Sequence, residues 1–208
     1  MEELLEMTLG GLLDRNADRW PDRPALLDLS TGEELTWAEF SRAAGRLAKG
    51  FLALGLEPGE HVALWGGSTI TWVLIQYAAA KAGVVIVSAD PDYTPDQMAY
   101  LLEQSEAGTA VLIGGYKDRD YPRILRGLCP EIGPGRELAL FSARLPALRR
   151  VILASEREEP GFLPFRRLAE LGEAVSDREL QDRQARVAPG DVALLSYTSG
   201  TTGAPKGV

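Results

Sequence analysis

The chain has 208 residues, 45% of them hydrophobic and 25% charged, which is typical of a soluble globular protein with one domain or part of a larger one. Its formal net charge of −8 argues against a nucleic acid or an anionic membrane as the main partner. The chain has one cysteine, Cys129, and one histidine, His61. These low numbers exclude a disulfide framework and a zinc cluster, and only His61 could act as the base of a Ser-His-Asp triad.

Amphipathic spacing and helix caps predict the helices. Apolar residues recur every three or four positions after Thr8. Thr36 with Glu39, and Thr94 with Gln97, match the capping box, in which a hydroxyl and a carboxylate or amide satisfy reciprocal backbone donors. The predicted helices are, in chain order, 8–20, 36–54, 69–82, 94–106 and a short charged helix that begins at Ser176 and Glu179.

Short apolar runs between these helices predict strands. In chain order they are 25–29, 34–36, 61–65, 84–87, 109–113, 149–153 and 191–197. Strands that alternate with helices indicate βαβ units. We therefore expect an α/β fold with a mostly parallel sheet flanked by helices, and we expect helices 36–54 and 69–82 to pack on that sheet.

Three further segments are interpreted as structural. Gly66–Ser68 is expected to be a strand-to-helix turn rather than a second ligand loop. Glu156–Glu159 is expected to be a solvated surface turn, because it lacks the ligand spacing of a metal site. Cys129 is expected to be a small buried hydrophobe rather than a nucleophile.

Two features bear on membranes and location. Acidic residues Glu2, Glu3 and Glu6 are unlike the positive start of a signal peptide. Residues 69–89 contain a single charge, Lys81, but Gly83 and the β-branched residues after it favour a helix followed by a strand over a membrane span. We expect no transmembrane segment and, with the low cysteine content, a cytoplasmic location.

The end of the chain carries the chemistry. Residues 197–208 read YTSGTTGAPKGV and follow the predicted strand 191–197. Glycines allow backbone N–H groups to face one point, where they form a cavity for anions. Hydroxyl groups add donors and Lys206 adds a positive charge. The segment is neither a Walker A loop nor a dinucleotide fingerprint, so composition leaves two readings, a phosphate-binding loop or a flexible linker.

Residues 197–208 resemble, almost residue for residue, the phosphate-binding loop of the adenylate-forming superfamily, which includes acyl-CoA synthetases, peptide-synthetase adenylation domains and luciferases. The resemblance extends over nearly all of the chain, through segments 9–26, 35–39, 79–83 and 90–93. Segments 72–74, 116–121 and 145–149 are similar to the fatty-acyl-CoA synthetases. Segment 90–95 instead resembles peptide-synthetase or coumarate-ligase sequences.

The resemblance implies a two-step reaction in which a carboxylate attacks ATP to give acyl-AMP, and the thiol of coenzyme A then displaces AMP. It implies ATP, Mg2+ and coenzyme A as cofactor or co-substrates, a small carboxylic acid as partner, and no nucleic acid. By position, the nucleotide-binding residues would be Thr198, Ser199, Gly200, Thr201, Thr202, Gly203, Ala204, Pro205 and Lys206. Ala204 occupies a variable position of the loop, and Pro205 would fix its exit.

The family's acidic metal ligand, base and ribose contacts, carboxylate pocket and catalytic lysine all follow this loop. We therefore expect residues 1–208 to be a partial N-terminal AMP-binding (adenylation) domain, without the C-terminal domain, without a catalytic residue of its own and inactive alone. The main hypothesis is the N-terminal portion of an acyl-CoA ligase for a fatty acid. The alternatives are a ligase for an aryl or amino acid, and a non-catalytic module that binds nucleotide weakly or provides an interaction surface.

Overall fold

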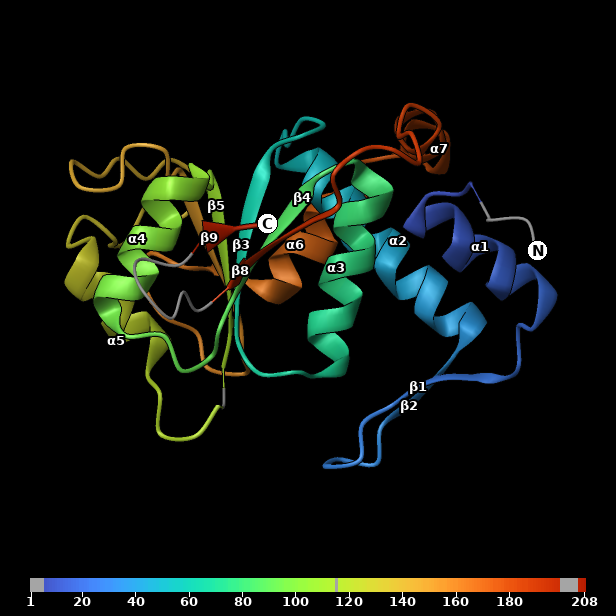
Figure 1. Ribbon diagram of the computed structural model, residues 1–208, viewed down its shortest axis with the longest axis horizontal. Helices are drawn as coiled ribbons and strands as arrows, with labels where there is room; N and C mark the ends of the chain where they lie inside the picture. The colour runs from blue at the N-terminus through green and yellow to red at the C-terminus, as the bar shows by residue number, and fades with distance from the viewer. Residues whose placement is uncertain (1–5, 115, 199–205) are drawn as a thin grey trace. The chain divides into compact units, whose positions relative to one another are not determined.

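The computed structural model describes residues 6–114, 116–198 and 206–208 (Figure 1). The chain divides into two compact units. Unit 1 contains residues 1–59, 69–84 and 169–193, and unit 2 contains residues 60–68, 85–168 and 194–208. Each unit is therefore assembled from three separate stretches of the chain.

Unit 1 is built from helices and one β-hairpin. Its helices are α1 (Leu9–Arg19), α2 (Trp37–Ala53), α3 (Ile70–Ala82) and α7 (Asp177–Gln184), and its hairpin joins β1 (Pro24–Leu27) to β2 (Glu34–Thr36). Helix α6 (Phe165–Gly172) begins in unit 2 and ends in unit 1. A small core of Leu13, Phe40 and Ala44 joins α1 to α2, and Tyr77 of α3 packs edge-on against Phe40 with ring centroids 4.9 Å apart.

The predicted helix caps of unit 1 are confirmed. The Thr8 hydroxyl accepts a hydrogen bond from the Gly11 N–H at 3.0 Å. Both reciprocal bonds of the capping box are present at Thr36 with Glu39, and again at Ser176 with Glu179. These bonds satisfy N–H groups that have no partner within the first turn of a helix, so they determine where each helix begins.

Unit 2 contains a sheet in the order β7-β6-β5-β3-β4-β8-β9. Its strands are β3 (His61–Trp65), β4 (Val85–Ala89), β5 (Thr109–Ile113), β6 (Arg150–Ala154), β7 (Leu163–Pro164), β8 (Leu194–Thr198) and β9 (Lys206–Gly207). Within the described part of the sheet every strand pair is parallel except β8 with β9. The predicted α/β class with a mostly parallel sheet is confirmed.

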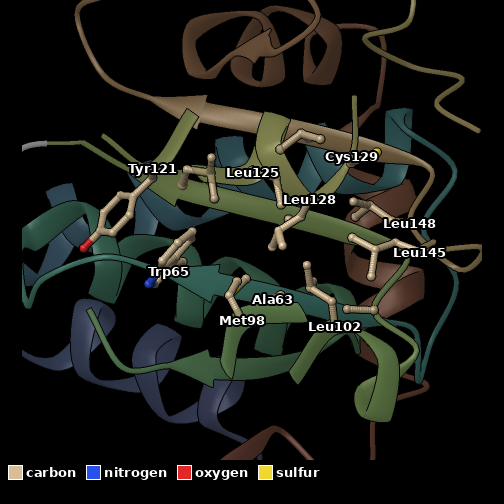
Figure 2. Close-up of a cluster of buried hydrophobic side chains, with 14 of the residues drawn as sticks. Ala63, Trp65, Met98, Leu102, Tyr121, Leu125, Leu128, Cys129, Leu145 and Leu148 are labelled. Atoms are coloured by element: carbon tan, nitrogen blue, oxygen red, sulfur yellow. The ribbon is translucent and has the colours of Figure 1, made fainter. Parts of the chain in front are cut away.

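Helices α4 (Pro95–Ser105) and α5 (Tyr121–Leu128) cover one face of this sheet. Figure 2 shows Ala63 and Trp65 of β3 pointing toward Met98 and Leu102 of α4 and toward the apolar side of α5. The alternate residues of β3, Val62 and Leu64, are also buried. Burial of both faces explains why the strands read as continuous apolar runs rather than as alternating patterns.

Several predicted boundaries are wrong by one to three residues. Strand 84–87 is in fact Val85–Ala89, because Gly83 ends α3 in the left-handed conformation at φ 73° and the Val84 N–H still bonds to Ala79 O of the helix. Strand 191–197 is in fact Leu194–Thr198, because a turn at 188–191, closed by the bond from Asp191 N–H to Ala188 O, precedes it. Strands 25–29 and 149–153 are Pro24–Leu27 and Arg150–Ala154.

Four elements, namely α5, α6, β7 and β9, are present in the structure without a matching sequence prediction. Helix α5 carries a readable signal, because Asp120 is its N-cap and Pro122 lies in its first turn. Within the described residues, no helix is both long enough and apolar enough to cross a bilayer.

Candidate nucleotide site

The predicted phosphate-binding loop connects two paired strands. Strand β8 runs parallel to β4 and pairs on its other side with the antiparallel β9, in the register Tyr197 with Gly207 and Thr198 with Lys206. Backbone bonds of 3.0 and 2.8 Å between Ser196 and Val208 close the pair. The backbones of Thr198 and Lys206, the first and last predicted site residues, are therefore brought opposite one another.

The predicted site residues between them are Ser199, Gly200, Thr201, Thr202, Gly203, Ala204 and Pro205, which lie outside the described residues. The strand expected before the loop is confirmed. Lys206 is exposed in β9. The loop thus leaves the sheet at the end of β8, and the lysine follows where the chain pairs with that strand again.

Gly207 has a packing role that was not predicted from the sequence. A Cβ at this position would lie 3.2 Å from Cζ of Tyr197, closer than most Cβ contacts in proteins. Tyr197 is half-buried against the apolar cluster of unit 2, and burial raises the pKa of its hydroxyl. The glycine therefore allows the returning strand to lie directly against the tyrosine ring.

Strand β8 ends at the carboxyl edge of the sheet, where the carboxyl ends of all the parallel strands lie. At this edge β3 is followed by Gly66, β4 by Asp90 and β5 by Gly114. Ligands of open α/β sheets bind outside the carboxyl ends of the strands. The position of the hairpin therefore agrees with a ligand-binding role for the loop it carries.

Close packing explains the glycines that end β3. A Cβ on Gly66 would lie 2.5 Å from Cβ of Ile113, and one on Gly67 would lie 2.8 Å from the ring of Tyr116. These glycines let the end of β3 approach β5 and the segment after it. Residues 66–68 connect β3 to α3, as predicted for a strand-to-helix turn.

A cavity of about 250 Å³ lies at the same edge, near the ends of β5 and β6. Its lining includes Arg119, Tyr121, Ser155 and Arg157. Burial raises the pKa of Tyr121 to about 12, and its hydroxyl donates a hydrogen bond to Pro91 O at 3.0 Å.

Cys129 is buried, as the sequence predicts, and His61 lies away from the carboxyl edge of the sheet. Cys129 is completely buried, and burial raises the pKa of its thiol. His61 begins β3 at the opposite, amino edge of the sheet, where its Nδ1 lies 2.6 Å from Ser105 O. Neither side chain lies with the hairpin that carries the predicted loop.

The interpretation of Glu156–Glu159 as a solvated turn is wrong for its last residue. The Glu159 side chain is 8% exposed and forms ion pairs with Arg126, at 2.8 Å, and with Arg157. Two guanidinium groups compensate the cost of burying this carboxylate. Among the described residues no group of three histidine, cysteine, aspartate or glutamate side chains is placed to hold a metal ion.

Comparisons with known proteins agree with this arrangement. Residues 13–208 match the family described as AMP-binding enzymes. The chain is 35% identical to a Bacillus subtilis (strain 168) protein named as acyl-CoA synthetase YngI, in an alignment that covers 100% of this chain and 38% of that protein. It is 33% identical to human medium-chain acyl-CoA ligase ACSF2, in an alignment that covers 99% of this chain and 34% of that protein. The chain therefore spans about a third of the length of the curated relatives it matches.

Solved structures have the same fold. One is a Rhodopseudomonas palustris CGA009 protein described as a long-chain-fatty-acid CoA ligase, with a TM-score of 0.70 and 25% identity over 99% of this chain and 44% of that one. Another is Mycobacterium smegmatis MbtA, with a TM-score of 0.74 and 27% identity over 98% of this chain and 33% of that one. With its fold, its hairpin and the match over residues 13–208, the chain belongs to the AMP-binding enzyme family.

Proposed function

We propose that the chain is the N-terminal part of an ATP-dependent acyl-CoA ligase. One oxygen of the acid substrate's carboxylate forms a bond to the α-phosphorus of ATP, and pyrophosphate leaves. The sulfur of coenzyme A then attacks the acyl carbonyl, and AMP leaves. The observation that carries this proposal is the pairing of Tyr197 and Thr198 with Gly207 and Lys206 at the carboxyl edge of a parallel sheet.

In this proposal the residues of the chain hold the leaving group. Negative charge builds on pyrophosphate as the bond to the α-phosphorus breaks, and donors already in place stabilise that charge without reorganising. The donors are the hydroxyls and N–H groups of Thr198 to Gly203 and the ammonium of Lys206. Because the hairpin pairs Thr198 with Lys206, the first and last of them are held to the same part of the sheet.

ATP would bind together with Mg2+, a proposal that rests on the resemblance to the adenylate-forming superfamily. The described residues offer no carboxylate cluster that fits the ion. We therefore assign no residue of this chain to the metal and derive no step through it.

We propose a medium-chain fatty acid as the substrate, supported by relatives named medium-chain acyl-CoA ligases that share 33–36% identity with this chain. The test uses the full-length protein with ATP, magnesium, coenzyme A and a panel of fatty, aryl and amino acids. Pyrophosphate release should be fastest with fatty acids of medium length. Preference for an aryl or amino acid would overturn the substrate proposal, and ATP binding without release for any acid would favour the non-catalytic alternative.

Lys206 provides the sharpest test of the loop's role. In the full-length protein, Lys206→Ala should slow acid-dependent exchange of pyrophosphate into ATP roughly a hundredfold, because loss of one preorganised contact to a developing charge costs ~3 kcal/mol. Binding of the acid should change little. Lys49→Ala is the matched control, because Lys49 pairs at 2.7 Å with an exposed carboxylate, Asp177, in unit 1. Equal exchange rates in wild type and Lys206→Ala would contradict the proposed role.

A further inference from the structure

The segment that follows β4 is held in an unusual way. Residues 90–93 present four consecutive backbone carbonyl groups, and each of them accepts a hydrogen bond from a side chain. The bonds are Trp65 Nε1 to Asp90 O at 3.0 Å, Tyr121 hydroxyl to Pro91 O at 3.0 Å, Arg119 Nη2 to Asp92 O at 2.7 Å and Arg119 Nη1 to Tyr93 O at 3.1 Å.

The donors are themselves fixed. Trp65 and Tyr121 are fully buried, and their rings pack with centroids 4.2 Å apart. Trp65 ends β3, whereas Tyr121 is the first residue of α5 (Figure 2). Arg119 uses one planar guanidinium for two neighbouring carbonyl groups, a geometry that a lysine cannot reproduce. The backbone of 90–93 is thus held by two buried aromatic side chains and one guanidinium, which come from two distant parts of the chain.

This segment lies at the same level of the sheet as the entry to the candidate nucleotide loop. Strands β4 and β8 are hydrogen-bonded neighbours, and Ser88 is in register with Ser196. Asp90 follows Ser88 by two positions, as Thr198 follows Ser196. Tyr93 and Tyr197 pack into the same apolar cluster. The segment 90–93 therefore continues the strand next to β8, and through Tyr93 it shares an apolar cluster with Tyr197 near the end of β8.

We propose that Trp65, Arg119 and Tyr121 are positioning residues for adenylation, which fix the backbone of residues 90–93 and, through it, the end of β8. This inference rests on the proposed function. Its physical basis is that the reaction rate depends strongly on geometry. A mutation far from the reacting atoms that displaces them by about 1 Å can lower the rate a hundredfold. The three residues act through the backbone of 90–93 and are not assigned contact with the substrate.

The test compares Arg119→Ala, Arg119→Lys and Tyr121→Phe in the full-length protein. Tyr121→Phe removes one donor and keeps the ring that packs on Trp65. Arg119→Ala should reduce kcat for pyrophosphate exchange on the order of tenfold to a hundredfold. Tyr121→Phe should reduce it less, Arg119→Lys should restore part of the loss, and KM for the acid should stay near the wild-type value.

Lys117→Ala is the matched control. Lys117 lies on the same segment as Arg119 and pairs with the Asp92 side chain at 2.6 Å, but both partners are 46% exposed or more and the pair contributes little. Its exchange rate should equal that of wild type. Thermal melting of each variant gives the second readout, because a positioning role requires loss of kcat in protein that remains folded at the assay temperature.

The outcomes separate the two proposals. No acid-dependent exchange in wild type would overturn the proposed function itself. With an active wild type, unchanged kcat in both Arg119→Ala and Tyr121→Phe would overturn the positioning role. A loss of activity that only follows the loss of folded protein would also overturn it, because the residues would then be purely structural.

Discussion

Removal of Asp14 tests the polar network inside unit 1. Its carboxylate on α1 accepts hydrogen bonds from Lys81 of α3, from Ser41 of α2 at 2.7 Å and from Gln184 of α7 at 2.8 Å. Helices α1, α2, α3 and α7 therefore meet at one carboxylate. Asp14→Ala would leave the Lys81 ammonium, whose side chain is 4% exposed, without this partner.

The magnitude follows from the burial of the two charges. Breaking a fully buried ion pair by removing one partner costs about 3–5 kcal/mol. The Asp14 side chain is 39% exposed, so water can reach the vacated position and lower this figure to about 2–4 kcal/mol. Ser41→Ala removes one hydrogen bond and should cost about 1 kcal/mol. Lys81→Met removes the buried charge at similar volume and should cost less than Asp14→Ala.

The assay is unfolding of the 208-residue chain in urea, followed by tryptophan fluorescence. By itself burial would raise the pKa of Asp14, but hydrogen bonds from Lys81, Gln184 and Ser41 and the charge of Lys81 outweigh it and lower the pKa. A lowered pKa in the folded state contributes stability above the unfolded value of about 3.9, and this contribution disappears as pH falls through the folded pKa. The difference between wild type and Asp14→Ala should therefore be full at pH 7 and shrink below about pH 4.

Two results would refute this reasoning. An Asp14→Ala cost no greater than that of Ser41→Ala would mean that Lys81 finds other compensation. A difference between wild type and Asp14→Ala that stays constant from pH 7 to pH 3 would mean that the carboxylate charge does not carry the effect.

Three further predictions concern local packing and chemistry. Gly66→Ala should destabilise the chain by about 1–3 kcal/mol in urea unfolding, because its Cβ would lie 2.5 Å from Cβ of Ile113. An unchanged free energy of unfolding would show that β5 can move away without cost. Thr36→Ala should cost about 1 kcal/mol in the same assay, with Glu39→Gln as a milder control that keeps the capping geometry. Cys129 should react with a thiol reagent at pH 8 far more slowly in the folded chain than in urea, since it is buried and its thiol pKa is raised; equal rates would contradict its burial.

Local physics explains what the sequence could predict of the fold. Capping boxes at Thr36 and Thr94 require only residues three positions apart, and both are present in the structure. The alternation of helices and apolar strands sufficed for the α/β class. Strand order was beyond this reading, because it depends on which strands pair across long separations. Lys81 shows the same limit, since its partner Asp14 lies 67 positions away in the sequence.

The candidate site was predictable in the part that is contiguous in sequence. A loop such as 198–206 carries its own glycines, hydroxyls and lysine, and a search along the chain finds it. Its surroundings are assembled differently, because parallel strands bring together chain segments that are distant in sequence. Trp65 reaches the carbonyl of Asp90 across 25 positions, and Tyr121 reaches that of Pro91 across 30. A buried tryptophan at the end of a strand reads in the sequence as core, and only the parallel register of β3, β4 and β8 brings it to the segment that follows β4, the neighbour of β8.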